Sequence, residues 1–136
     1  MPLARQTLYE RGVQLLLAPT WDRGEPWLST LRHTAKEGRA YVDGSCSAVR
    51  LDDVPDRLDF KRALAPPPSG WINPGDSVIV DPDGKVVAGP LHEAQGLLFG
   101  EVVPERITGP RWQLDVAGHY ARRDVFPFEP PPLGRG

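Results

Sequence analysis

Prolines and glycines divide this chain into short segments, and this spacing constrains the fold more than any other feature. The 136 residues include 16 prolines and 14 glycines. Proline lacks a backbone N–H and glycine favours turns, so neither suits the interior of a long helix. The sequence therefore predicts short strands, tight turns and irregular loops in place of a helical bundle. A chain of this length can bury roughly two-thirds of the surface that it exposes when unfolded, which suffices for one core.

The first part of the chain alternates between helical and strand patterns. A helix is predicted over residues 3–11 with Gly12 as its stop, and a strand covered on both faces over residues 13–18. A second helix is predicted from Pro26 to Gly38, followed by a second strand over residues 40–49. This order predicts an α/β layered domain.

The second part contains one clear hairpin. Residues 77–80 and 85–88 are apolar and flank Asp81-Pro82-Asp83-Gly84, whose Pro and Gly suit a tight turn. Residues 50–72 are predicted to form a long surface loop, and residues 96–103 one more strand. From Pro104 onward the chain is rich in aromatic residues but shows little regular hydrophobic periodicity. We therefore expect this segment to pack on another part of the protein.

Charge and cysteine content exclude several classes of function. The formal net charge is -2 and charges of both signs are mixed along the chain, so no nucleic-acid partner is expected. No apolar run is long enough to span a bilayer, and the N-terminus lacks a signal core, so we expect a cytoplasmic protein with no membrane partner. Cys46 is the sole cysteine, which excludes an intrachain disulfide, and no metal-ligand spacing is present, so no metal is expected.

Cys46 invites two interpretations. A thiolate beside a base is a strong nucleophile, so a small hydrolase that uses Cys46 with His33 or His119 is one possibility. However, Cys46 lies in a predicted strand, where a free cysteine is usually a small buried hydrophobe, and this structural role is favoured. His33 is predicted to be a solvated or loosely paired side chain on its helix.

Trp21 and Asp22 follow the first predicted strand almost immediately. Loops beyond strand ends are where α/β layers usually meet ligands, which makes this pair a candidate binding position. An equally weighted alternative is that Asp22 organises the turn into the next helix.

Several segments resemble, in the same order, the nitrilase branch of the carbon–nitrogen hydrolase superfamily. They are Met1-Pro2-Leu3-Ala4-Arg5, Ala18-Pro19-Thr20-Trp21-Asp22, the stretch 75–84, Gly89-Pro90-Leu91, Gly96-Leu97-Leu98 and the stretch 115–126. The resemblance implies a partial α-β-β-α sandwich of nitrilase type, with a β-hairpin and an irregular C-terminal tail. Residues 1–128 would form the C-terminal half of the hydrolase domain, and residues 129–136 a Pro/Gly-rich tail.

The resemblance also implies a chemistry. In the complete enzyme a cysteine thiolate attacks a nitrile carbon, a Glu acts as general base and a Lys stabilises charge, and the products are a carboxylic acid and ammonia. The family's Glu, Lys and Cys are expected upstream of Met1, so no catalytic residue is assigned in this chain, which alone is expected to be inactive. No metal or organic cofactor is implied.

What this chain is expected to contribute is a wall of the substrate pocket, through Thr20, Trp21 and, less directly, Ser45. The expected partners are a nitrile substrate and either a separately supplied N-terminal half or a second copy of the chain. The alternatives are a non-catalytic interaction module and the second half of a split nitrilase.

Overall fold

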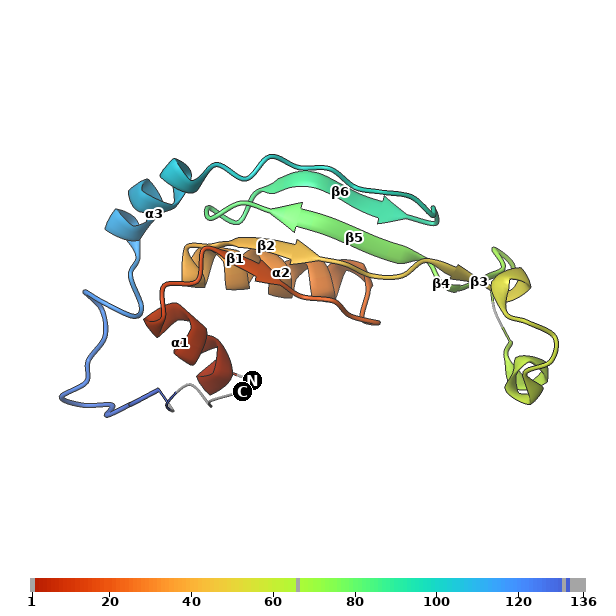
Figure 1. Cartoon of the computed structure of the whole chain (residues 1–136), viewed down its shortest axis with the longest axis horizontal. Coiled ribbons are helices and arrows are strands. Elements are labelled where there is room, and N and C mark those ends of the chain that lie inside the picture. The colour runs from red at the N-terminus through yellow and green to blue at the C-terminus, as the bar shows by residue number, and fades with distance from the viewer. Residues whose placement is uncertain (1, 66, 131, 133–136) are drawn as a thin grey trace.

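A four-stranded mixed sheet carries the fold in the computed structural model, which describes residues 2–65, 67–130 and 132 (Figure 1). The strand order is β1 (Leu15–Leu17), β2 (Tyr41–Gly44), β5 (Gly75–Val80) and β6 (Val86–His92). β1 and β2 are parallel, and the other two pairs are antiparallel. Met1 and most of the predicted 129–136 tail lie outside the described residues.

One helix, α2 (Gly24–Gly38), covers one face of this sheet, and α1 (Pro2–Glu10) packs against α2 (Figure 1). Because Val42 pairs with Leu16 on one side and Val80 on the other, these side chains share a face. Leu31 and Ala35 of α2 close over them. The resulting cluster consists of Leu31, Ala35, Val42, Val78 and Val80, with Leu16, Ala18, Trp27, Leu28 and Val86 packed around it.

The opposite face of the sheet is uncovered along β1. Leu15 and Leu17 of β1 are 43% and 62% exposed. The prediction that this strand is covered on both faces is therefore wrong for the described chain, because side chains alternate along β1 and only the Leu16 side meets a helix. Farther across, the segment after β6 does lie on this face: the Tyr41 hydroxyl accepts a hydrogen bond from the Val103 N–H at 3.2 Å.

The predicted strand over residues 40–49 splits into two pieces. β2 ends at Gly44, Cys46 forms an isolated bridge with Thr20, and β3 (Val49–Arg50) pairs with β4 (Trp71–Asn73) in a separate two-stranded sheet. The segment predicted as a long loop, residues 50–72, thus contributes most of a short strand and two 3₁₀ helices, Leu51–Asp53 and Asp59–Ala63. These elements are too short to give a periodic signal.

The predicted strand over residues 96–103 is wrong, since the structure has no strand there. The glycine at position 100 lies so close to Ile79 that a Cβ would come within 2.8 Å of the Ile79 Cδ1. Residues 96–103 are therefore held against the sheet by this close glycine contact and by the hydrogen bond from Val103 to the Tyr41 hydroxyl. A ladder of backbone hydrogen bonds is not formed. A 3₁₀ helix (Pro104–Ile107) and α3 (Thr108–Gln113) follow.

The predicted hairpin and the first helix stop are confirmed. Asp81 and Gly84 close the turn with a 2.9 Å hydrogen bond from the Gly84 N–H to the Asp81 carbonyl, and Gly84 has the positive φ of 80° that favours glycine. Gly12 has a φ of 69° just beyond α1.

The C-terminal segment is attached through Arg39, which is almost fully buried. Its guanidinium donates hydrogen bonds to the carbonyls of Leu114 (3.2 Å) and Pro82 (3.3 Å). The aromatic side chains farther along are less engaged, because Trp112 is 94% exposed and Phe126 is 75% exposed. Within the described part of the chain, no helix has both the length and the apolar character needed to cross a membrane.

Truncation of Leu31 should test the one-sided core. Leu31→Ala removes a fully buried side chain between α2 and the sheet, and such changes cost about 2–5 kcal/mol of unfolding free energy. Urea unfolding followed by circular dichroism measures the change. Leu3→Ala, at an exposed position of α1, is the matched control. Equal stabilities of the two variants would contradict this assignment of the core.

Candidate functional site

A cleft of about 550 Å³ opens where β1 and β2 end, on the face of the sheet away from α2. Its apolar side comes from Leu91, Leu97 and Leu98. Its polar side chains are Thr20, Asp43, Ser45, Ser47, Ser77 and Gln95. Loops beyond adjacent strand ends thus form a concave surface lined by several hydroxyl-bearing residues. Such a position is the usual location of ligand sites in α/β layers.

The structure brings two of the three predicted pocket residues together. The Thr20 N–H donates to the Ser45 carbonyl at 2.9 Å, and both residues line the cleft. Trp21 does not line it, and its side chain is 57% exposed. Contact of Thr20, Trp21 and Ser45 with a substrate stays a prediction.

Asp22 organises the turn into α2, which was one of its two proposed roles. Its N–H donates to the Thr20 Oγ1 at 2.9 Å, and its own Oδ1 accepts from the Arg23 N–H at 2.9 Å. These local hydrogen bonds are typical of turns that carry Asp and Thr.

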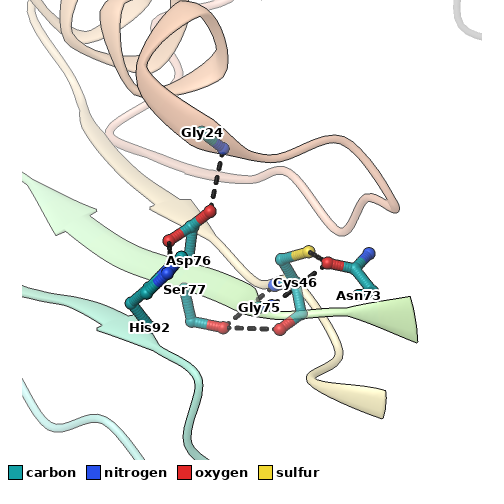
Figure 2. A network of polar contacts seen from close by, with 7 residues as sticks. All are labelled: Gly24, Cys46, Asn73, Gly75, Asp76, Ser77 and His92. Carbon is teal, nitrogen blue, oxygen red and sulfur yellow. Dashed lines mark hydrogen bonds and ion pairs between the residues drawn. The ribbon is translucent and has the colours of Figure 1, made fainter. Parts of the chain in front are cut away.

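A network of polar contacts holds the wall of the cleft in place (Figure 2). The Ser77 Oγ accepts a hydrogen bond from the Cys46 N–H and donates one to the Cys46 carbonyl, each at 3.0 Å. Asn73 is fully buried; its Oδ1 accepts from the Gly75 N–H at 3.1 Å, and its Nδ2 donates to the Trp21 carbonyl at 2.9 Å. Two side chains thereby fix three segments that are distant in sequence.

Asp76 extends this network to the start of α2. Its Oδ2 accepts from the Gly24 N–H at 2.8 Å, and its Oδ1 lies 2.6 Å from the His92 Nδ1 (Figure 2). The backbone of Asp76 has a φ of 85°, in the left-handed region that is costly for most residues but tolerated by Asp. A carboxylate at a helix start is also favoured by the helix dipole.

Cys46 is buried among these contacts, and its thiol faces an amide oxygen. Its side chain is 5% exposed, and its Sγ lies 3.7 Å from the Asn73 Oδ1. Burial raises the pKa of the Cys46 thiol, and the contact with Asn73 only partly opposes this effect. A thiol with a raised pKa is a poor nucleophile.

The histidines considered as its base lie elsewhere. The His33 Nε2 is 3.5 Å from a Glu37 carboxylate oxygen on α2, and the His119 ring contacts the Tyr120 ring with centroids 4.8 Å apart. No described histidine lines the cleft that Cys46 lines. The structure thus favours the structural role of Cys46 over the hydrolase that pairs it with His33 or His119. Among the described residues, no group of three His, Cys, Asp or Glu side chains could hold a metal ion.

Sequence patterns missed four members of the network: Asn73, Asp76, Ser77 and His92. Their partners are distant in sequence, so spacing alone gave no sign of them. Asp43 was considered only within the segment Asp43-Gly44-Ser45 at the strand end, and both Asp43 and Ser45 line the cleft. Its carboxylate could have been singled out, because a carboxylate inside a predicted strand is uncommon.

Comparison with known proteins decides the family. The family model described as Carbon-nitrogen hydrolase matches residues 1–111. The chain belongs to this family. Among curated relatives, an arylacetonitrilase of Trametes versicolor is 41% identical over 96% of this chain and 42% of its own length. A nitrilase of Bradyrhizobium diazoefficiens is 37% identical over 93% of this chain and 39% of its own length. The resemblance to the nitrilase branch is confirmed, and the chain spans about 40% of the length of these relatives.

Solved structures show the same fold. Nit3 of Saccharomyces cerevisiae, a member of branch 10 of the nitrilase superfamily, matches 89% of this chain and 40% of its own with a TM-score of 0.64 at 21% identity. A carbon–nitrogen hydrolase of Helicobacter pylori G27 matches 93% of this chain and 45% of its own with a TM-score of 0.65 at 16% identity. The nitrilase-type fold expected from the sequence is therefore confirmed for this carbon–nitrogen hydrolase chain, as a partial sandwich.

Removal of the Ser77 hydroxyl should loosen the cleft wall. Ser77→Ala takes away the acceptor of the Cys46 N–H, and loss of such a partner costs about 1–3 kcal/mol. Urea unfolding measures the loss. Ser69→Ala, at an exposed position outside the cleft, should change stability by less than about 0.5 kcal/mol. A Ser77→Ala variant as stable as Ser69→Ala would show that the contact does not hold the wall.

The Cys46 thiol should resist alkylation in the native chain. Since the thiolate is the reactive form, burial and a raised pKa predict labelling by iodoacetamide at pH 8 that is about 10-fold or more slower than in urea. The native rate should still be rising with pH above the ordinary pKa of a free thiol. Mass spectrometry measures both rates, and equal rates would contradict the buried, protonated state.

Proposed function

We propose that this chain is the C-terminal part of a nitrilase and forms one wall of its substrate cleft. The observation that carries the proposal is the match of 93–96% of the chain to nitrilases over only 39–42% of their length. The cleft and the uncovered sheet face beside it support the same conclusion. In the complete enzyme, the other part of the fold supplies the nucleophilic cysteine, the Glu and the Lys that the resemblance implies.

The proposed reaction converts a nitrile to a carboxylic acid and ammonia. The cysteine sulfur adds to the nitrile carbon to give a thioimidate. One water displaces the nitrogen as ammonia, leaving a thioester, and a second water releases the acid and restores the thiol. The role proposed for this chain is to position the substrate through Thr20 and Ser45, which line the cleft.

The uncovered sheet face gives the proposal a physical basis. Leu15 and Leu17 are exposed in a row on β1, and an exposed apolar strand at a sheet edge favours association. The four-layer sandwich of the family provides a second sheet for such a face. Association with a separately supplied N-terminal half is therefore part of the proposal, as are the self-association and cytoplasmic location expected from the sequence.

A non-catalytic interaction module is the second candidate. Exposed aromatic side chains on the C-terminal segment, notably Trp112 and Phe126, favour it, since such residues are common at protein interfaces. In that case the chain would bind a partner without any contribution to hydrolysis.

Ammonia release distinguishes the two candidates. The purified chain is tested with aliphatic and aromatic nitriles, alone and with the N-terminal catalytic part of a nitrilase relative. The proposal predicts ammonia only from the mixture, and none when the nucleophilic cysteine of the added part is changed to alanine. Ammonia from this chain alone would contradict the assignment and redirect attention to Cys46. No ammonia release from any mixture would favour the interaction module.

A further inference from the structure

The turn that leads into α2 contains Thr20, which lines the cleft. Three hydrogen bonds tie this turn to the chain around the start of β5, and all three partners lie within residues 72–76. They join the Trp21 carbonyl to the Asn73 Nδ2 (2.9 Å), the Arg23 guanidinium to the Ile72 carbonyl (2.7 Å) and the Gly24 N–H to the Asp76 Oδ2 (2.8 Å). The shape of the turn therefore depends on one short segment.

The contact with Asp76 takes the place of a helix cap. The first N–H groups of a helix have no partner within it, and a Ser, Thr, Asp or Asn just before the helix usually accepts from one of them. In α2 that position is held by Arg23, whose side chain makes no cap hydrogen bond. Asp76, 52 residues away along the chain, accepts from Gly24 instead. It thus fixes the start of α2 relative to the sheet.

Two features aim the Asp76 carboxylate at the helix (Figure 2). The pairing of β5 with β6 shifts register between Gly75 and Ser77, so Asp76 is the extra residue of a β-bulge. Its φ of 85° is strained for a residue other than glycine, and such strain persists where surrounding contacts hold it and is common at functional sites. The His92 Nδ1 lies 2.6 Å from the Asp76 Oδ1, which leaves Oδ2 for the helix start.

The same turn holds the hydroxyl of Thr20. Its Oγ1 accepts a hydrogen bond from the Asp22 N–H at 2.9 Å, two residues before Gly24. A hydroxyl that accepts one hydrogen bond still has a proton to donate to a ligand. Asp76 reaches this turn through the first residue of α2, so the path does not depend on what covers the opposite face of the sheet.

We propose that Asp76 is a positioning residue for the cleft, which holds Thr20 in place through the start of α2, and that His92 orients its carboxylate. Neither Asp76 nor His92 lines the cleft. This deepens the proposed function and rests on it for the effect on catalysis: the position of a nitrile beside Thr20 would depend on a carboxylate behind the cleft wall. The hold on Thr20 itself can be tested without any hydrolysis.

Asp76→Gly tests the hold without backbone strain, because glycine adopts a positive φ readily. Amide hydrogen exchange of the whole chain, measured by NMR, reports on the Gly24 and Asp22 N–H groups. Loss of a hydrogen bond to a charged group should speed exchange at both positions by on the order of 10-fold. The amide of Val42, which is fully buried in β2, reports global opening and should change less than either.

Substitutions of His92 separate orientation of the carboxylate from a merely structural role. His92→Ala should also speed exchange of the Gly24 amide, because the Asp76 carboxylate can then rotate away from it. His92→Asn supplies an amide N–H near the position of the ring Nδ1 and should restore most of the protection. His33→Ala, at an exposed histidine farther along α2, is the matched control and should leave exchange of Gly24 unchanged.

Activity tests whether Asp76 acts through Thr20. In the mixture with the N-terminal part of a nitrilase relative, Thr20→Ala and Asp76→Gly should each lower kcat/KM by on the order of 10-fold. The double variant should lose no more than Thr20→Ala alone, since residues that act through one contact are not additive.

Several results would overturn the proposal. They are unchanged exchange of Gly24 and Asp22 in Asp76→Gly, no restoration by His92→Asn, and additive losses of activity in the double variant. If Asp76→Gly fails to fold, the two His92 variants decide the matter. No ammonia from any native mixture would contradict the proposed function, while hydrogen exchange would still decide whether Asp76 holds Thr20, so the two failures are distinguishable.

Discussion

The packing of α2 against one face of the sheet is the contact on which the rest of the structure depends. Leu31 and Ala35 meet Val42, Val78 and Val80, and together they form the apolar cluster at the centre of the described fold. Because strand side chains alternate, burial of one face places the other set of side chains on the opposite side. Leu15 and Leu17 are left exposed for this reason, and the exposed face follows directly from the one-sided core.

The cleft depends on the same sheet but is held by polar contacts. Ser77 fixes the backbone of Cys46, Asn73 joins the turn after β1 to the start of β5, and Asp76 joins the start of α2 to the sheet. These contacts link segments that are 31 to 52 residues apart in sequence. A rigid wall of this kind can position a substrate for chemistry supplied by another part of the fold.

Elements with strong local signals were predictable from the sequence. The helix that ends before Gly12, the helix that includes Pro26 and the hairpin at Asp81–Gly84 each have a turn or cap residue that fixes the backbone locally. β4 and the separate pairing of β3 with it were missed, because these strands have three and two residues, too few for a periodic pattern. Residues 96–103 looked like a strand by composition, yet glycine at position 100 allows close contact with Ile79 and no ladder forms. The cleft was located only in part, through Thr20 and Ser45, since its supporting contacts are long-range.

Association of this chain with the catalytic part of a nitrilase is the central claim, and sedimentation tests it most directly. We would mix the chain with the N-terminal part of a nitrilase relative and compare it with Leu17→Asp, which places a charge on the uncovered face. We expect a one-to-one complex for the native chain and a clear loss of that complex for Leu17→Asp. No complex with the native chain, or an equally stable complex with Leu17→Asp, would contradict it.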